Sequence, residues 1–294
     1  MENIVSTLKN IPLKKIYSGK VRELFEIDAN SMLMVTTDRI SAFDFILPTL
    51  IPDKGKILNK ISLFWFDYLK NFYPNHIITS DFNEFPDILK PYKDILQERS
   101  IIVKKVKKIP IECIARGYLS GSGWKEYKEK ATICGNKLPL GLKESEKIPE
   151  PIFTPSTKEE VGIHDINISF EQMIEITGED TSEFLKKASL DIYKKASEYA
   201  YKKGIIIADT KFEFGFDGEK IILIDEILTP DSSRFWESKT YQVGKSQDSL
   251  DKQYIRDYLE SIKWNKKEPV PILLPNIVEK TREKYLQIYD ILTS

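Results

Sequence analysis

Cysteine and histidine are scarce in this chain, which has two of each among its 294 residues. Cys113 and Cys134 lack the paired spacing of a zinc site, and His76 and His164 are too few for a histidine-built metal centre. Because Cys113 stands in an apolar run, we expect it to be a buried thiol in a reducing compartment.

Net charge and long apolar runs are also lacking. The formal net charge is −1, so no general attraction to nucleic acid is expected. No apolar run reaches the roughly 18 residues that a membrane helix needs, and residues 1–15 lack the apolar core of a signal peptide. We therefore expect a soluble cytoplasmic protein that binds neither nucleic acid nor membrane. Its length allows two lobes, since single cores stop growing at roughly 250–300 residues.

Residues 205–236 combine apolar strands with a group of charged side chains. Residues 205–209 are an apolar run that ends in a carboxylate, and residues 221–224 form a second apolar run. The pair Asp217-Gly218 between them is a strong hairpin signal. The stretch therefore predicts two antiparallel strands joined by a tight turn.

Charged residues gather at one end of this hairpin. Lys211 and Glu213 are two residues apart on a strand, so their side chains share one face. Asp225 ends the return strand, and Asp231 and Arg234 follow in a loop. Carboxylates suit Mg²⁺, which binds one or two of them together with substrate phosphates. A salt-bridged hairpin is the simpler alternative for any one pair, but the whole cluster favours a phosphate and metal site.

Two glycine turns can bind anions. Ser18-Gly19-Lys20 joins two short expected strands, with Arg22 just beyond, and backbone N–H groups at such a turn can cover phosphates. Residues 120–123, Ser-Gly-Ser-Gly, stand between an expected strand and a helix, where N–H groups point at an anion. Either turn can also be only a turn or a helix cap.

Residues 38–44, DRISAFD, have two interpretations that the sequence does not separate. The loop can serve capping and salt bridging only, or it can recognise a small zwitterion through a guanidinium and carboxylates. Residues 134–168 lack periodicity and contain four prolines, which predicts a long loop. Within it, residues 153–160 and 162–169 are too rich in hydroxyls and charge for a core.

Helical signals complete the pattern. Apolar residues recur with helical spacing over residues 55–73, and a longer helix is expected over 181–203. Ser169 and Gln172 form a capping-box pattern. Two more helices are expected, one at about residues 251–263 and a final amphipathic one that ends near residue 292.

Three stretches closely resemble the SAICAR synthetase family, the phosphoribosylaminoimidazole-succinocarboxamide synthases of purine biosynthesis. IPIECIARGYLSGS (109–122) and IIIADTKFEFG (205–215) look like the two signature motifs of the family, and YSGKVRELFE (17–26) resembles its phosphate-covering loop. Further matches follow in the family's order, so the resemblance spans about residues 12–240. The length and the RGYLSGSGWKEY wording resemble the longer, fungal-type branch.

The resemblance implies an α+β fold of two lobes with ATP between them. Residues 1–108 would form an antiparallel β lobe similar to a protein-kinase small lobe. Residues 109–294 would form an ATP-grasp-like catalytic lobe with C-terminal helices.

The resemblance also implies the reaction. ATP, carboxyaminoimidazole ribotide (CAIR) and L-aspartate would give ADP, phosphate and the succinocarboxamide product through an acyl phosphate, with ATP and Mg²⁺ as cofactors. The partners would be these small molecules, and the protein would be a monomer, with an oligomer left open.

The family's site residues can be carried over to matching positions. Catalysis would fall to Lys211, Glu213 and Asp225, of which Glu213 and Asp225 would hold Mg²⁺. The expected ATP-binding residues are Ser18, Gly19, Lys20, Val21, Arg22, Val106, Lys108 and Glu112. The expected ribotide-binding residues are Arg116, Ser122, Asp231 and Arg234. The expected aspartate-binding residues are Asp38, Ser41, Asp44, Lys158 and Asp165.

Two other functions compete with this interpretation. A small-molecule kinase with the same nucleotide cleft would need no aspartate, but the chain lacks the H-R-D-x-x-x-x-N pattern of a protein-kinase catalytic loop. A non-catalytic binding protein is expected to have lost Lys211, Glu213 or Asp225, and all three are present.

Overall fold

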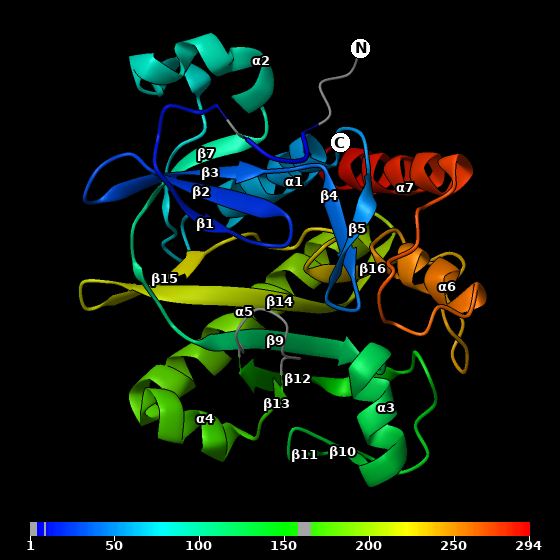
Figure 1. Ribbon diagram of the computed structural model, residues 1–294. Helices are drawn as coiled ribbons and strands as arrows, with labels where there is room; N and C mark the ends of the chain where they lie inside the picture. The colour runs from blue at the N-terminus through cyan, green and yellow to red at the C-terminus, as the bar shows by residue number, and fades with distance from the viewer. Residues whose placement is uncertain (1–4, 9, 158–165) are drawn as a thin grey trace. The chain divides into compact units, whose positions relative to one another are not determined.

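The computed structural model describes residues 5–8, 10–157 and 166–294. The chain folds into two compact units, whose helices and strands are labelled in Figure 1. The first unit comprises Met1–Tyr68, Asn75–Lys107 and Asp251–Ser294, and the second comprises Leu69–Pro74 and Lys108–Leu250. Antiparallel sheets and helices occur in both, so the predicted α+β class is confirmed.

A five-stranded antiparallel sheet forms the centre of the first unit, with the order β1-β2-β3-β7-β6. The strands are β1 (Lys15–Ser18), β2 (Arg22–Glu26), β3 (Ser31–Thr36), β6 (Ile77–Thr79) and β7 (Ser100–Lys104). Burial alternates along β2, where Glu23 and Phe25 point inward. This period of two is what a half-buried strand shows.

Helices cover this sheet. They are α1 (Lys54–Leu69), η1 (Phe82–Glu84), η2 (Asp87–Tyr92) and α2 (Lys93–Leu96). In α1 the expected apolar stripe is confirmed at Ile57, Ile61 and Trp65, which are buried. Phe72 lies beyond the end of the helix and is exposed, so the stripe is shorter than predicted.

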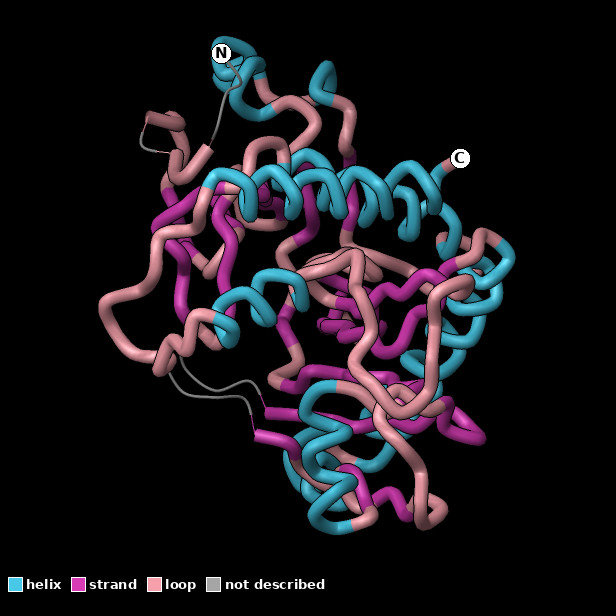
Figure 2. The backbone as a smooth tube through the Cα atoms, turned by 90° about the vertical axis from the view of Figure 1, so that its right-hand side faces the viewer, coloured by secondary structure: helices cyan, strands magenta, loops and turns pink. Residues whose placement is uncertain are grey.

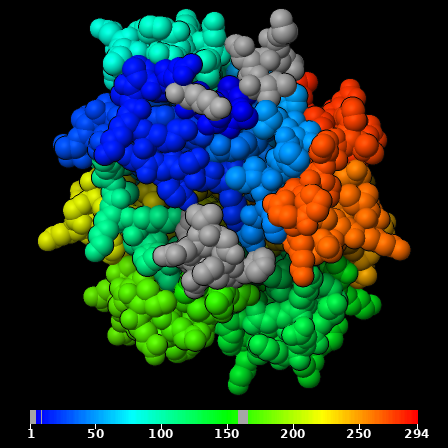
Figure 3. All heavy atoms as spheres, viewed as in Figure 1, coloured from blue at the N-terminus to red at the C-terminus, as the bar shows by residue number. Residues whose placement is uncertain are grey.

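The C-terminal helices share a hydrophobic core with the hairpin of β4 (Arg39–Ala42) and β5 (Phe45–Leu50). The helices are α6 (Gln253–Ser261) and α7 (Pro275–Thr293), and α7 runs to the C-terminus in Figure 2. In Figure 3 the orange and red spheres of this segment lie beside the light-blue spheres of the hairpin. This grouping differs from the expected one, in which residues 251–294 belonged to the second lobe. The sequence of an amphipathic helix shows which face is buried, but it does not show which other element packs against that face.

The second unit is built on a seven-stranded sheet with the order β13-β12-β9-β14-β15, in which β14 also pairs with β8 and β16. Its strands are β8 (Lys107–Lys108), β9 (Ile111–Tyr118), β12 (Lys147–Thr157), β13 (Ile166–Asn167), β14 (Ile205–Asp217), β15 (Lys220–Ile224) and β16 (Ser233–Glu237). A small hairpin, β10 (Thr132–Ile133) with β11 (Asn136–Lys137), is separate. The predicted Asp217-Gly218 turn is confirmed, since Asp217 pairs with Lys220 and Gly218 has a φ of 63°.

Three helices belong to this unit: α3 (Gly121–Lys130), α4 (Phe170–Thr177) and α5 (Glu179–Lys202). The capping box of Ser169 and Gln172 starts α4, as predicted. Small and apolar residues of α5, among them Leu185, Ala196 and Ala200, are buried where the helix lies along β9 and β14 (Figure 1). One face of the sheet is thereby covered.

The expected long loop over residues 134–168 is partly wrong. The 11-residue strand β12 runs through it and pairs with β9. Thr154 and Ser156 are buried although the hydroxyl-rich stretch was expected outside the core. Buried hydroxyls are tolerated where they find partners, and the Thr154 Oγ1 accepts a hydrogen bond of 2.9 Å from Arg116 Nε.

Candidate active site

The pairing of β9 with β14 places charged side chains next to one another on one face of the second unit's sheet. Arg116 pairs directly with Asp209, and Lys211 pairs with Ile114. Because side chains alternate along a strand, Asp209, Lys211 and Glu213 share one face of β14. Cys113 and Phe212, which pair with each other, point to the other face and are fully buried. The expectation of a buried Cys113 thiol is confirmed.

Asp209 is the centre of the first cluster on this face. Its carboxylate oxygen Oδ2 lies 3.1 Å from Arg116 Nη1 and 2.7 Å from Arg234 Nη1, and Oδ1 lies 2.8 Å from the same Arg234 atom. Ser120 Oγ donates a hydrogen bond of 3.0 Å to Oδ2. Asp209 is only 4% exposed. One buried carboxylate thus holds two guanidinium groups that come from different strands.

The charges in this cluster are maintained despite burial. Burial by itself raises the pKa of Asp209, but Arg234 and Arg116 outweigh it and hold that pKa below its usual value. Burial also lowers the pKa of Arg116, which Asp209 opposes. The guanidinium stays charged because its ordinary pKa is so high. Two cations against one anion leave the cluster with a positive excess.

The start of α3 adds anion-binding groups to the two arginines. Ser120 is the N-cap residue, and Arg116 Nη2 donates a hydrogen bond of 3.3 Å to Ser122 Oγ. Gly121 has a φ of 53°, which L side chains rarely adopt, and a Cβ there would lie 2.2 Å from Arg234 Nη2, so a larger residue would be strained and would displace this guanidinium. Helix N-termini favour anions. The predicted turn before a helix is confirmed, and its geometry suits a phosphate group.

Lys211 is the centre of the second cluster. Its Nζ lies 2.8 Å from Glu112 Oε1 and 2.8 Å from Glu213 Oε1. The other oxygen of Glu213 is paired with Lys108. Burial lowers the pKa of Lys211, but Glu213, Glu112 and Asp225 more than offset this and raise it well above its usual value. Lys211 is therefore protonated at neutral pH.

Asp225 follows β15 directly, and the residue before it, Ile224, pairs with Glu213. Its φ of 65° places it in the left-handed region, which aspartate tolerates better than most residues. Among the residues that the structure describes, no three His, Cys, Asp or Glu side chains form a metal site by themselves. Glu213 and Asp225 still fit a nucleotide-bound Mg²⁺, which needs only one or two protein carboxylates.

The loop between β15 and β16 carries Asp231 and is tied together internally. Ser232 N–H donates a hydrogen bond of 3.1 Å to the Thr229 carbonyl, and Asp231 N–H donates one of 3.3 Å to Thr229 Oγ1. The loop leads directly to Arg234 on β16. Asp231 was expected to orient Arg234 or to bind the ribose, and Asp209 is the carboxylate that the structure places on Arg234.

Five of the expected ATP-binding residues, at positions 18–22, lie at or beside the β1–β2 turn of the first unit. Gly19 N–H donates a hydrogen bond of 2.8 Å to the Arg22 carbonyl, which closes the turn. Ser18 pairs with Glu23 at its edge. Val106 is half-buried and lies just before β8. Contacts of these residues with a nucleotide stay a prediction.

Asp38 was expected to bind aspartate, but its surroundings argue against direct contact with any substrate. It is 0% exposed, and it accepts hydrogen bonds from Val5 N–H at 2.7 Å and from Gly55 N–H at 2.9 Å. Arg99 Nη1 lies 3.0 Å from its Oδ2. A carboxylate with both oxygens bound in the interior is structural. We therefore leave Asp38 out of the proposed substrate ligands.

Of the other expected aspartate-binding residues, the structure describes two and leaves two undescribed. Ser41 is buried in β4, and Asp44, in the turn after it, is paired with Lys20. These contacts favour the structural interpretation of the DRISAFD segment. Lys158 and Asp165 lie outside the described residues.

Asp209 is the residue that the sequence analysis missed as part of the site. The sequence shows it as a carboxylate two residues before Lys211, and the same alternation that pairs Lys211 with Glu213 includes it. Ser120 was expected as part of the anion-binding turn, but its hydrogen bond to Asp209 was not, nor was the hydrogen bond that Thr154 accepts from Arg116. Their signal is tertiary, because it depends on strand pairing.

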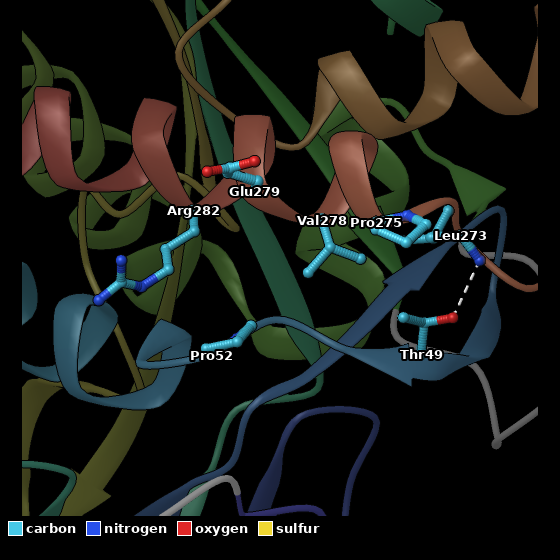
Figure 4. A pocket seen from close by; sticks show the side chains of 7 residues that line it. All are labelled: Thr49, Pro52, Leu273, Pro275, Val278, Glu279 and Arg282. Carbon is cyan, nitrogen blue, oxygen red and sulfur yellow. Dashed lines mark hydrogen bonds between the residues drawn. The ribbon is translucent and has the colours of Figure 1, made fainter. Parts of the chain in front are cut away.

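A hollow of about 350 Å³ lies elsewhere, in the first unit, between the end of β5 and the start of α7 (Figure 4). Thr49, Pro52, Leu273, Pro275, Val278, Glu279 and Arg282 line it. Arg282 Nη2 lies 2.6 Å from Asp53 Oδ2. Its lining is mostly apolar, so it does not resemble a phosphate site.

No helix in the described part of the chain is long and apolar enough to span a membrane.

The comparisons with known proteins agree with the geometry. Residues 15–271 match the family model of SAICAR synthetase. A phosphoribosylaminoimidazole-succinocarboxamide synthase of Thermodesulfovibrio yellowstonii is 59% identical over 294 residues, with 100% of both chains covered.

Two solved structures of SAICAR synthetases differ in their likeness to this chain. The SAICAR synthase of Saccharomyces cerevisiae, solved in complex with SAICAR, has a TM-score of 0.90 at 48% identity, covering 99% of this chain and 98% of that one. The SAICAR synthetase of Pyrococcus horikoshii has a TM-score of 0.66 at 25% identity, covering 92% and 97%. The greater likeness to the yeast protein supports the expected fungal-type branch. The chain belongs to the SAICAR synthetase family.

Proposed function

We propose that this chain joins L-aspartate to the carboxylate of CAIR and uses ATP to drive the reaction, in purine biosynthesis. The observation that carries the proposal is the single polar face of β14. On it, Asp209 with its two arginines stands two residues from Lys211 and its carboxylates. A site for a phosphate monoester thus lies beside a site for a second anion. A ribotide carboxylate carries both groups.

The proposed ribotide-phosphate site is formed by Arg116, Arg234, Ser122 and the start of α3. Guanidinium groups bind phosphate through planar, paired hydrogen bonds. Asp209 holds both guanidinium groups in place before substrate arrives, which reduces the entropy lost on binding. Asp231 is kept as a candidate for the ribose.

Lys211 is proposed to bind the CAIR carboxylate or the transferring phosphoryl group. Because Glu213 and Glu112 raise its pKa, Lys211 is proposed as a cation rather than as a general base. Its ammonium group neutralises charge that gathers during phosphoryl transfer.

Glu213 and Asp225 are the proposed Mg²⁺ ligands. When bound, the ion would supply charge neutralisation on the nucleotide phosphates. Lys108, which pairs with Glu213 in the structure, would then turn toward a phosphate or solvent. The β1–β2 turn with Ser18, Gly19, Lys20, Val21 and Arg22 is proposed to cover the phosphates. Val106 and Glu112 are kept as candidates for the adenosine part.

The proposed reaction has two steps. A carboxylate oxygen of CAIR attacks the γ-phosphorus of ATP, the bond to the bridging oxygen breaks, and ADP leaves. The aspartate nitrogen then attacks the carbonyl carbon of the acyl phosphate. A C–N bond forms, the C–O bond breaks with its electrons on phosphate, and the amine releases a proton. The acyl phosphate is needed because a free carboxylate is a poor electrophile.

The function is tested by measuring ADP release from MgATP and CAIR with and without L-aspartate. We expect fast ADP release only when all three are present, in equal amounts with the succinocarboxamide product. ADP formed at the full rate without aspartate would contradict a ligase and indicate a kinase or an ATPase. Omission of CAIR is the matching control.

Arg234→Ala should weaken ribotide binding by about tenfold to a hundredfold, which is the loss of a charged hydrogen bond of roughly 1.5–3 kcal/mol. ATP affinity should change little. Isothermal titration with CAIR and with ATP measures both. Arg282→Ala, which removes an aspartate-paired arginine far along the chain, is the control. An unchanged CAIR affinity in Arg234→Ala would place the phosphate elsewhere.

A further inference from the structure

Arg39, the first residue of β4, donates hydrogen bonds to the backbone of the β1–β2 turn. Arg39 Nη2 donates a hydrogen bond of 2.9 Å to the Gly19 carbonyl, and Nε donates one of 3.1 Å to the Lys20 carbonyl. One guanidinium group thus binds two successive carbonyls of the turn. The whole arrangement lies within the first unit.

Arg39 is itself held in position by a buried carboxylate. Its Nη1 lies 3.0 Å from Glu23 Oε1 and donates a further hydrogen bond of 2.9 Å to the Ser6 carbonyl. The side chain of Glu23 is 1% exposed and that of Arg39 is 12% exposed. Glu23 also accepts hydrogen bonds from Leu8 N–H and Thr7 Oγ1. The guanidinium is therefore bound on several sides and has little freedom.

Glu23 is charged in this position. Burial raises its pKa, but hydrogen bonds from Lys15, Thr7, Leu8 and Arg39 outweigh burial and hold the pKa below its ordinary value. A carboxylate that stays ionised keeps Arg39 anchored across the neutral range.

The hydrogen bonds of Arg39 determine which way the turn presents its backbone. A peptide group is planar and trans, so its N–H points opposite to its C=O. With the Gly19 and Lys20 carbonyls turned toward Arg39, the N–H groups of Lys20 and Val21 point away from it. The Val21 carbonyl is bound as well, by Thr37 N–H at 2.9 Å and Thr37 Oγ1 at 2.7 Å. Successive N–H groups that point one way form an anion-binding concavity.

The same hairpin contacts the turn at a second point. Asp44 lies in the tight turn between β4 and β5, with a φ of 67°, and pairs with Lys20. The side chain of Lys20 is thereby held at the turn, while Arg39 holds its backbone. Arg39 and Asp44, both from the DRISAFD segment, thus contact the glycine turn.

We propose that Arg39 is a positioning residue for the nucleotide phosphates. It keeps the carbonyl oxygens of Gly19 and Lys20 away from phosphate oxygens, which they would repel, and it directs the N–H groups of Lys20 and Val21 outward. This inference rests on the proposed function, which places the ATP phosphates at the β1–β2 turn. The arginine of the DRISAFD segment then serves the nucleotide rather than a zwitterion.

Arginine is required at this position because of its shape. A guanidinium offers five N–H donors in a rigid planar arrangement, and Arg39 uses Nε, Nη1 and Nη2 on four acceptors. The ammonium group of a lysine has three donors on one atom and cannot reach Glu23 and both carbonyls together. Arg39→Lys thus keeps the charge against Glu23 and loses the hold on the turn.

The test measures dissociation constants of MgATP and of CAIR for the full chain by isothermal titration. The variants are Arg39→Lys and Arg39→Met, with Lys15→Met as the matched control. Lys15 Nζ also pairs with Glu23, at 2.8 Å, but no contact joins it to the carbonyls of Gly19 or Lys20 in the described part of the chain. Lys15→Met therefore removes a cation from Glu23 and leaves the turn held.

We expect Arg39→Lys to weaken MgATP binding about tenfold or more, with CAIR binding changed less than about twofold. Lys15→Met should leave both affinities near those of the wild type. The KM for ATP should rise in Arg39→Lys while the KM for CAIR stays constant.

Three results would overturn the inference. They are an unchanged ATP affinity in Arg39→Lys, an equal loss of ATP and CAIR affinity in that variant, and an equal loss of ATP affinity in Lys15→Met. If Arg39→Met does not fold, Arg39→Lys still decides, because it retains a cation beside Glu23. A wild-type protein that does not bind MgATP would instead contradict the proposed function.

Discussion

Asp225→Asn should lower the turnover number by about a hundredfold or more, because charge stabilisation by a bound metal ion is worth several kcal/mol. The fold should persist. Asparagine tolerates the left-handed backbone that Asp225 adopts, at φ 65°, at least as well as aspartate does. The substitution removes the charge of one of the two carboxylates that are proposed to bind Mg²⁺. Steady-state kinetics across Mg²⁺ concentrations should also show a higher Mg²⁺ requirement.

Asp217→Asn is the control for this variant. Asp217 lies at the other end of the same hairpin, and Asn-Gly suits a tight turn as well as Asp-Gly does. Its turnover should match that of the wild type. If Asp225→Asn also turned over at the wild-type rate, Asp225 would have no part in the metal or phosphate site.

Asp209→Asn should lower the free energy of unfolding by about 3–5 kcal/mol, the effect of removing one partner from a buried ion pair. The substitution leaves Arg116 and Arg234 beside each other without their shared carboxylate. Their repulsion should also spoil the proposed phosphate site, so CAIR affinity should fall with stability. Urea denaturation at pH 7 measures the first effect and titration with CAIR the second.

The pH dependence checks the same cluster. The native pKa of Asp209 is held below its usual value, so its contribution is present above about pH 4 and is lost as the pH falls through the native pKa. The stability difference between wild type and Asp209→Asn should therefore shrink in acid. Glu283→Gln, which removes an exposed helix pair with Lys280, should change stability little at any pH. A difference that is constant from pH 7 to pH 3 would contradict the assignment of the effect to the Asp209 charge.

Short-range patterns were read correctly from the sequence where neighbouring residues decide the structure. The Asp217-Gly218 turn, the capping box of Ser169 and Gln172, and the shared face of Lys211 and Glu213 are all confirmed. Each depends on residues two or three positions apart. The backbone geometry of a strand, a turn or a first helical turn determines such relations without help from the rest of the chain.

Patterns that depend on distant partners were read less well. The hydroxyl-rich stretch of β12 was expected outside the core, but Thr154 is buried because Arg116, 38 residues away, donates a hydrogen bond to it. Residues 251–294 show amphipathic helices, but only the structure pairs them with the hairpin of β4 and β5. Asp38 carries a charge that could bind a ligand, but its carboxylate is paired with Arg99 and accepts hydrogen bonds from two backbone N–H groups inside the first unit.

By itself the sequence determined most of the elements and the family resemblance, because these follow from local periodicity and from motifs read along one strand or turn. Only the tertiary structure decided which charges meet. Arg116 and Asp209 are 93 residues apart and become neighbours through the register of β9 and β14. Arg39 holds a turn 19 to 20 residues before it. Such pairings depend on how strands align, and strand alignment is a property of the whole sheet rather than of any one segment.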